Sequence, residues 1–286
     1  MASPDVTAFF DEATNTVSYV VADPATSQCV VIDPVLDYDA AAGRVSTRSV
    51  DEIIEFIAAQ DLNLDLVMET HVHADHLTAA PVLKEQLNSR TAIGTHIKTV
   101  QDVFSDVFNL SDLAADGSQF DLLLSDCDEI QIGSLTCRVM HTPGHTPACN
   151  TYVIGDAAFI GDTLFMPDYG TARCDFPGGD AGLLFDSIQR IFQLPDDTRL
   201  FLCHDYKAPG RNEFAWETTV AEQRRSNLHI KDGTSKEAFV AFRNERDLQL
   251  EVPALILPSI QVNIRAGDMP ETESNGVSYL KIPLQY

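Results

Sequence analysis

Several features that mark common classes of protein are missing or scarce in this sequence. Only 19 of its 286 residues are Lys or Arg, against 43 Asp or Glu, so the formal net charge is −24. Such a charge repels the phosphate backbone of nucleic acids, and we expect no nucleic-acid partner. Solubility is the simpler reading of the acidity.

No apolar run approaches the roughly 20 residues of a membrane-spanning helix, so we expect no membrane partner. The stretch 1–5 has no basic segment followed by an apolar one, which predicts no signal peptide. Six cysteines occur without Cys-x-x-Cys spacing. In a chain of this size that indicates reduced thiols and a cytoplasmic setting.

The most informative stretch is Thr70-His71-Val72-His73-Ala74-Asp75-His76, which follows the apolar run 64–68. Its side chains are types that bind first-row metals. In an extended segment, alternation places His71 and His73 on the same side. A lone buried histidine usually only forms hydrogen bonds, but four candidate ligands in six residues predict a metal site.

The rest of the chain predicts an α/β fold. Three β-rich runs (6–10, 16–21 and 29–32) predict an antiparallel meander. It ends in Asp33-Pro34, either a turn or a group facing a site. Hairpins are expected around Gly133-Ser134 and Gly155-Asp156, and strands at 64–68 and 199–203. Apolar spacing predicts helices over 50–59 (capped by Ser49 or Asp51), 77–87, 96–107, 183–192, 215–228 and 235–246, before an irregular tail.

This order of elements predicts two sheets packed face to face with helices on both outer faces, and a site at one edge. Three further strand ends carry candidate ligands, namely His145, Asp162 and His204. With them the His-x-His-x-Asp-His stretch resembles the metallo-β-lactamase superfamily over most of residues 6 to 207. The resemblance implies a four-layer αββα sandwich, with a catalytic domain over 1–210 and a C-terminal extension over 211–286 packed on it.

That resemblance implies two kinds of metal centre. A two-zinc hydrolase would use His71, His73 and His145 at one metal and Asp75, His76 and His204 at the other, with Asp162 bridging. A one-iron enzyme would use two His and one carboxylate and leave positions open. For the iron case the candidates are His71, His145 and Asp162.

Shorter motifs favour iron. Arg173-Cys174-Asp175-Phe176 and His204-Asp205-Tyr206 resemble the Arg-x-Asp-Phe and His-Asp-Tyr patterns of the persulfide dioxygenases, whereas glyoxalase II thioesterases usually show His-Glu-Tyr. The insertion 166–171 and the long tail resemble the bacterial branch of that family. The resemblance implies oxidation of glutathione persulfide by dioxygen and water at one Fe²⁺ per chain, giving sulfite and glutathione.

Carried over position by position, the resemblance makes His71, His145 and Asp162 the iron ligands. Outer groups that orient them would be His73, Asp75, His76 and His204. Catalytic roles would fall to Arg173, Tyr206 and Asp175. Because the substrate carries carboxylates, we expect a local basic pocket built from Arg173, Tyr206, Lys207, Arg211 and Arg243.

Other interpretations stay open at this point. A two-zinc thioesterase acting on glutathione thioesters would use the same ligands, and a non-enzymatic metal or sulfur module is a third alternative. Cys149 and Cys174 border the site motifs but are more typical of packing residues. We interpret His141 as structural and His96 as a cap or surface residue. The metal, the exact persulfide, and a homodimer built through the tail stay open.

Overall fold

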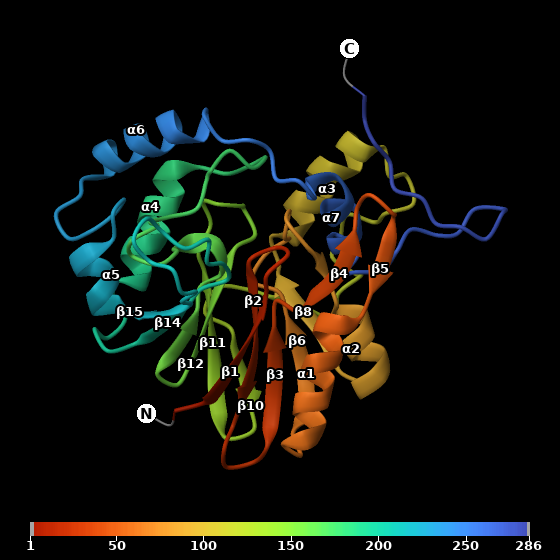
Figure 1. The fold of residues 1–286 in the computed structure, drawn as a ribbon, viewed down its shortest axis with the longest axis horizontal. Helices are drawn as coiled ribbons and strands as arrows, with labels where there is room; N and C mark the ends of the chain where they lie inside the picture. Colours follow the sequence, from red (N-terminus) through yellow and green to blue (C-terminus); the bar gives the residue numbers. More distant parts are fainter. Residues whose placement is uncertain (1–2, 285–286) are drawn as a thin grey trace.

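Two six-stranded sheets pack face to face in the computed structural model, which describes residues 3–284 (Figure 1). The first sheet has the order β1-β2-β3-β6-β8-β9, formed by Asp5–Asp11, Thr16–Ala22, Gln28–Ile32, Asn63–Met68, Arg90–Gly94 and Leu122–Leu124. The second has the order β10-β11-β12-β13-β14-β15, formed by Glu129–Ile132, Leu135–His141, Asn150–Ile154, Ala157–Phe159, Arg199–Phe201 and Glu217–Thr219. A small third sheet joins β5 (Arg44–Ser46), β4 (Val35–Asp39) and β7 (Leu77–Thr78).

Helices cover both outer faces of this sandwich. Those packed on or beside the first sheet are α1 (Arg48–Ala59), α2 (Ala80–Leu87), α3 (Ile97–Phe108) and α7 (Ile256–Asn263). Those on the second are α4 (Ala181–Ile191), α5 (Val220–Ser226) and α6 (Lys236–Asp247), and a 3-10 turn, η1, spans Gly161–Thr163. The expected four-layer αββα sandwich is confirmed.

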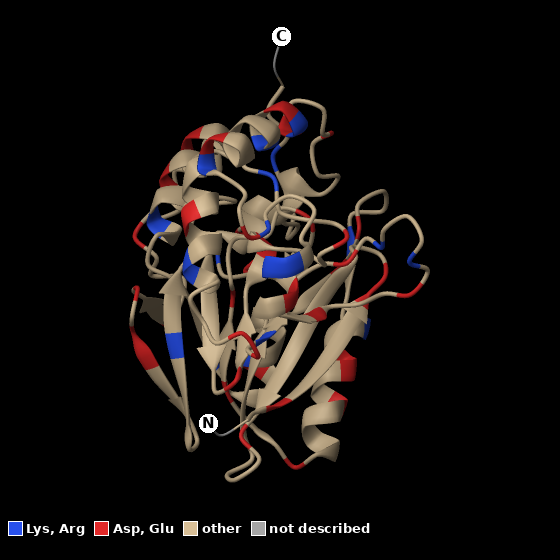
Figure 2. Cartoon of the chain, turned by 90° about the vertical axis from the view of Figure 1, so that its left-hand side faces the viewer, with Lys and Arg blue, Asp and Glu red and all other residues tan. Residues whose placement is uncertain are grey.

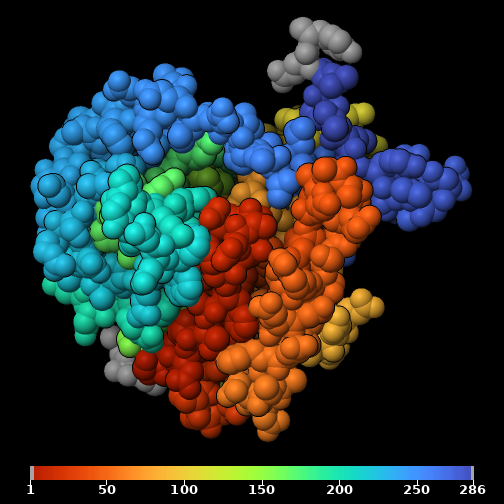
Figure 3. Space-filling view, viewed as in Figure 1, coloured from red at the N-terminus to blue at the C-terminus, as the bar shows by residue number. Residues whose placement is uncertain are grey.

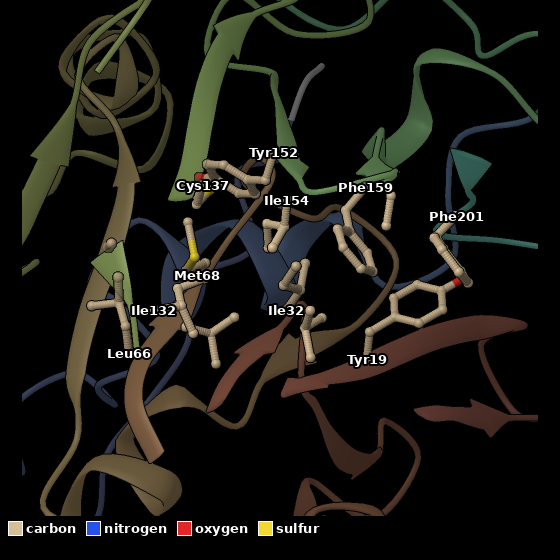
Figure 4. Close-up of a cluster of buried hydrophobic side chains, with 14 of the residues drawn as sticks. Tyr19, Ile32, Leu66, Met68, Ile132, Cys137, Tyr152, Ile154, Phe159 and Phe201 are labelled. Atoms are coloured by element: carbon tan, nitrogen blue, oxygen red, sulfur yellow. The ribbon is translucent and has the colours of Figure 1, made fainter. Parts of the chain in front are cut away.

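The core between the sheets is built from alternate residues of facing strands. Tyr19, Ile32 and Met68 of the first sheet meet Tyr152 and Phe159 of the second, all at most 2% exposed (Figure 4). Burying side chains of this size contributes about 1.5–3 kcal/mol each. This packing fixes how the strand ends of one sheet lie relative to those of the other.

Strand direction decides where the loops gather. The pairs β3–β6, β6–β8 and β8–β9 are parallel, whereas β1, β2 and β3 form the expected antiparallel meander. The carboxyl ends of β3 and β6 therefore lie at one edge of the sheet. Asp33 follows β3 there and the histidine-rich stretch follows β6.

The bounds of three expected segments need correction. The expected helix 77–87 begins as strand β7 because Thr78 is drawn into pairing with β4, and α2 starts only at Ala80. The expected helix 215–228 begins as β15, and Thr219 caps the shorter α5 by accepting a hydrogen bond from the Glu222 N–H. The tail expected to be irregular contains α7, whose Pro258 lies in the first turn, where no helical N–H bond is needed.

The hairpins at Gly133-Ser134 and Gly155-Asp156 form as expected. Helix α1 starts at Arg48, so Ser49 and Asp51 lie inside its first turn instead of capping it. Met1 and Ala2, part of the stretch behind the signal-peptide expectation, lie outside the described residues. Within 3–284, no helix combines the length and apolarity needed to cross a membrane.

Candidate metal centre

The histidine-rich loop directly after β6 packs its rings against one another. The ring centroids of His71 and His73 are 4.1 Å apart, and those of His73 and His76 are 4.2 Å apart. All three side chains are 1% exposed. Burying three imidazoles together costs folding free energy unless their ring nitrogens bind hydrogen-bond partners or a metal ion.

Three further loops bring their candidate ligands to the same place. His145 lies between β11 and β12, Asp162 lies in η1 after β13, and His204 follows β14. The Oδ2 atom of Asp162 lies 3.8 Å from His71 Nε2 and 3.6 Å from His145 Nε2. Its Oδ1 atom lies 3.4 Å from His204 Nε2. Asp162 is therefore central to the cluster.

Ligand atoms of His71, His145 and Asp162 all lie within 4.8 Å of one another. Two histidines and one carboxylate in this arrangement are the donor set of mononuclear non-haem iron sites, although zinc accepts the same atoms. The structure thus brings together the three ligands expected from the sequence.

Hydrogen bonds fix the orientation of two of these histidines. Nδ1 of His71 lies 3.0 Å from Thr70 Oγ1, which itself donates to Asp33 Oδ2 at 2.7 Å. That hydroxyl therefore accepts from His71 Nδ1–H. Nδ1 of His145 donates to the backbone carbonyl of Arg173 at 2.8 Å. In both rings Nε2 is left with a free lone pair, the form that binds a metal ion.

Buried atoms without hydrogen bonds test whether a metal ion fits here. Among the described residues they include His73 Nδ1, Asp75 Oδ2, His76 Nε2, Asp162 Oδ1 and His204 Nε2. Native proteins rarely leave such atoms unsatisfied. Six of the twelve such atoms in residues 3–284, counting both ring nitrogens of His73, belong to the predicted ligand set, so the residues present fit a metal centre.

A second group of donors lies next to the first. His204 Nε2 is 3.0 Å from Asp75 Oδ2, and the ligand atoms of His73, Asp75 and His76 lie within 4.8 Å of one another. The chain therefore has the residues for a second metal position beside the mononuclear one. In the absence of a second ion, the same contacts orient the rings around Asp162.

Electrostatics favour the metal-binding form of His71. Burial, and then the neighbouring His73 and His145, lower the pKa of His71 well below its usual value. The ring therefore stays neutral, and a neutral imidazole is what a metal ion requires.

Asp33, whose role the sequence left open, faces the site. Its carboxylate accepts hydrogen bonds from the N–H and the hydroxyl of Thr70, both at 2.7 Å, and lies 3.0 Å from His73 Nε2. Glu69, 3.4 Å from the same nitrogen, is a site residue that the sequence reading missed. The sequence signal that could have identified Glu69 is its position directly before the stretch 70–76.

A cavity of about 440 Å³ opens on the centre. Its inner wall includes Asp75, His145 and Asp162, while its outer wall comes from Ala13–Asn15 of the β1–β2 turn and from segments near the end of α6. Figure 3 shows a hollow on this face between the red N-terminal segment and the blue C-terminal extension. The volume falls in the range of small-molecule sites, roughly 300–1,000 Å³.

Three of the expected substrate residues line this cavity, namely Arg173, Tyr206 and Arg243. Arg173 pairs with the carboxylate of Asp175 at 2.6 Å and donates to the Glu251 carbonyl at 2.7 Å. Arg243 is 1% exposed and pairs with Asp247 at 2.6 Å. Tyr206, 40% exposed, packs its ring against Tyr169 and Phe165.

The other two expected substrate residues are engaged elsewhere. Arg211 donates to Asp205 and Asp168 at 2.6 to 3.1 Å. The Lys207 ammonium lies 4.0 Å from the centre of the Phe214 ring. Neither residue lines the cavity, because each is held by a local partner. No sequence pattern predicted these partners.

The cysteines beside the motifs are packed and protonated. Cys149 is 3% exposed, and burial raises the pKa of its thiol to about 12. Burial also raises the pKa of Cys174. A thiol that does not ionise is a poor nucleophile. His141 stacks on His96 with centroids 4.1 Å apart, and His229 lies against Thr171, so none of these three histidines joins the ligand cluster.

Comparison with known families agrees with this geometry. Residues 12–204 match the family model described as metallo-beta-lactamase superfamily. The chain belongs to this superfamily. The matched span contains all the candidate ligands and ends at His204, so α6 and α7 lie outside it.

Relatives within the superfamily carry different names. The chain is 53% identical to a probable metallo-hydrolase of Burkholderia pseudomallei (98% of both chains) and 49% identical to glyoxylase B2 of Dictyostelium discoideum (93% and 92%). It is 30% identical to the human mitochondrial persulfide dioxygenase ETHE1 (90% and 87%). It spans 65% of the length of the beta-lactamase hydrolase-like proteins it matches.

Among solved structures, ETHE1 from Myxococcus xanthus superposes with a TM-score of 0.74 at 33% identity. The match covers 92% of this chain and all of that one. The chain thus shares its fold with the ETHE1 structure, whereas the names of its relatives divide between hydrolases and a dioxygenase.

Proposed function

We propose that this chain is a persulfide dioxygenase that oxidises glutathione persulfide with dioxygen and water to sulfite and glutathione. The observation that carries the proposal is the mutual proximity of His71, His145 and Asp162, of which His145 and Asp162 line the cavity. Two histidines and one carboxylate leave coordination positions open for a substrate and for dioxygen. The likeness to ETHE1 proteins supports the same reading.

One bound Fe²⁺, held by those three residues, would supply the activation of dioxygen that protein side chains lack. The protein's own contribution is orientation. Thr70 and the Arg173 carbonyl hold the two imidazoles with Nε2 toward Asp162. His204 lies 3.4 Å from Asp162 Oδ1 and 3.0 Å from Asp75 Oδ2, and His73 packs against the His71 ring, so these outer residues would help to orient the ligands.

Cavity residues would hold the substrate above the centre. Arg173 stays in place because Asp175 and the Glu251 carbonyl bind its guanidinium. Tyr206 offers a hydroxyl on an aromatic wall shared with Tyr169. The proposal includes a cytoplasmic setting, in keeping with six cysteines that are all free thiols.

A specific observation favours one second candidate, a two-zinc thioesterase acting on glutathione thioesters. Asp75 Oδ2 and His204 Nε2 face each other at 3.0 Å and His76 Nε2 has no hydrogen-bond partner, so the donors of a second metal position lie together. Metal-bound hydroxide between two zinc ions is a standard hydrolytic device. The name glyoxylase B2 on one relative agrees with this candidate.

The deciding experiment measures oxygen uptake and sulfite together. Purified protein loaded with Fe²⁺ receives glutathione persulfide, and the same preparation is tested with a glutathione thioester and analysed for iron and zinc. We expect uptake coupled to sulfite, about one iron per chain, and no uptake in His71→Ala. Two zinc ions per chain with thioester hydrolysis and no uptake would replace the proposal by the second candidate.

A further inference from the structure

Arg246, in the last turn of α6, differs from the other arginines of the cavity. It lines the cavity together with Arg173 and Arg243. Those two are held by Asp175 and Asp247, respectively. Within residues 3–284, by contrast, Arg246 forms no ion pair and no side-chain hydrogen bond. An arginine side chain without a partner at a cavity wall is available to a ligand.

The charges of this wall leave a local positive excess. On the side of the cavity near the end of α6, the guanidinium groups of Arg173, Arg243 and Arg246 outnumber the carboxylates of Asp175 and Asp247 by one, whereas Asp75 and Asp162 lie at the metal centre. The positive charges also act on His229, whose pKa is lowered to about 4 by burial first and then by Arg243 and Arg246. Elsewhere Asp and Glu are spread over many elements (Figure 2). This wall is therefore where an anion would be tolerated.

Position along the cavity suggests what the anion belongs to. The metal ligands His145 and Asp162 form one part of the wall, and Arg246 enters from the C-terminal extension with Leu250, Pro253 and Leu255. A substrate whose sulfur lies at the metal centre would present its remaining groups to this extension. Guanidinium groups bind carboxylates through paired N–H donors.

We propose that Arg246 binds a carboxylate of the thiol substrate and so selects substrates that carry one at a distance from the reacting sulfur. The inference rests on the proposed function for its choice of glutathione persulfide. It would hold equally for a glutathione thioester, because the cavity and the arginine are the same. Arg246 is thus a specificity residue and takes no part in the chemistry.

The test compares Arg246→Met with wild type on two substrates, glutathione persulfide and the persulfide of glutathione diethyl ester. Arg225→Met is the matched control, because Arg225 on α5 is exposed and does not line the cavity. Loss of one ligand–arginine pair should raise KM for glutathione persulfide about tenfold, equal to ~1.4 kcal/mol, with kcat little changed. The diester should show almost the same KM in all three proteins.

Calorimetric binding of glutathione and of its diethyl ester to the metal-loaded proteins separates this inference from the proposed function. If Arg246→Met binds glutathione more weakly than wild type does, but binds the diethyl ester equally well, the proposed role of Arg246 is supported even if no oxygen is consumed. An unchanged Kd and KM in Arg246→Met would overturn it, whatever the reaction proves to be. Equal losses in Arg225→Met, or equal losses for the diester, would also overturn it.

Discussion

The side-chain amide of Asn263 donates a hydrogen bond to the backbone carbonyl of His73 at 2.8 Å, across 190 positions of sequence. Its second proton goes to the carbonyl of His76, also at 2.8 Å, and its Oδ1 accepts from the Thr78 N–H at 2.9 Å. Helix α7 therefore holds the second half of the loop that carries four of the seven candidate ligands.

Replacing Asn263 by Ala should loosen that loop. Two buried carbonyls and one N–H would lose their partners, at a cost of about 1–3 kcal/mol for each unsatisfied group. We expect weaker metal binding, by roughly 10-fold or more, as for other residues that support ligands. Competition with a chromophoric chelator measures the affinity. Asn244→Ala, on the exposed side of α6, is the control and should match wild type.

Asp162→Ala should abolish iron binding and activity together. The remaining ligands His71 and His145 are neutral, so the variant offers no charge to the ion and only two of three donors. Metal analysis of the purified variant gives the answer, with the exposed Asp186→Ala as the control. A full complement of iron in Asp162→Ala would show that the ligand assignment is wrong.

Arg173→Ala removes a guanidinium from the cavity wall but leaves the backbone carbonyl that holds His145. We therefore expect KM to rise severalfold while kcat falls less, as for a group that mainly grips the substrate. Steady-state kinetics with glutathione persulfide would show this. A large loss of kcat at unchanged KM would place Arg173 in the chemistry instead.

His229 should make the protein sensitive to acid. Its folded pKa of about 4 lies below the usual 6.5, because partial burial, and then the charges of Arg243 and Arg246, disfavour the protonated ring. Stability from this group is complete above pH 6.5 and is lost as the pH falls toward 4. At pH 5 the loss is on the order of 1 kcal/mol, because solvent screens a group that is only partly buried.

The variant His229→Asn keeps an acceptor near Nδ1 but cannot take up a proton. Denaturant unfolding at pH 7 and pH 5, at equal metal content, should show a smaller loss of unfolding free energy in the variant than in wild type. Equal losses in both proteins would mean that other groups cause the acid sensitivity.

The sequence could predict the ligand cluster because its chemistry lies in short motifs at strand ends. Four of the seven candidate ligands fall within residues 71–76, and parallel strands bring their ends to one edge. The pattern of apolar residues likewise predicted two sheets with helices outside. These features depend on local spacing, which the sequence displays directly.

Long-range partners were not predictable in the same way. Nothing near Asn263 shows that its amide will meet His73, and nothing near Arg211 shows that Asp168 and Asp205 will bind it. Arg243 is a partial exception, since Asp247 lies four positions later, one residue past the expected helix 235–246, at the spacing of an intrahelical ion pair. Arg246 stood out only once the partners of its neighbours were known.

The contact between Asn263 and the histidine loop has a consequence for how the protein is made. A ribosome would finish residues 71–76 long before it reaches His145, Asp162 or His204, and Asn263 would emerge last of all. A metal ion that binds before then would have only the unfolded segment 71–76, with three histidines and one aspartate, as its ligand. Stable metal binding therefore requires synthesis of the chain at least through Asn263, so the complete metal centre forms late in folding.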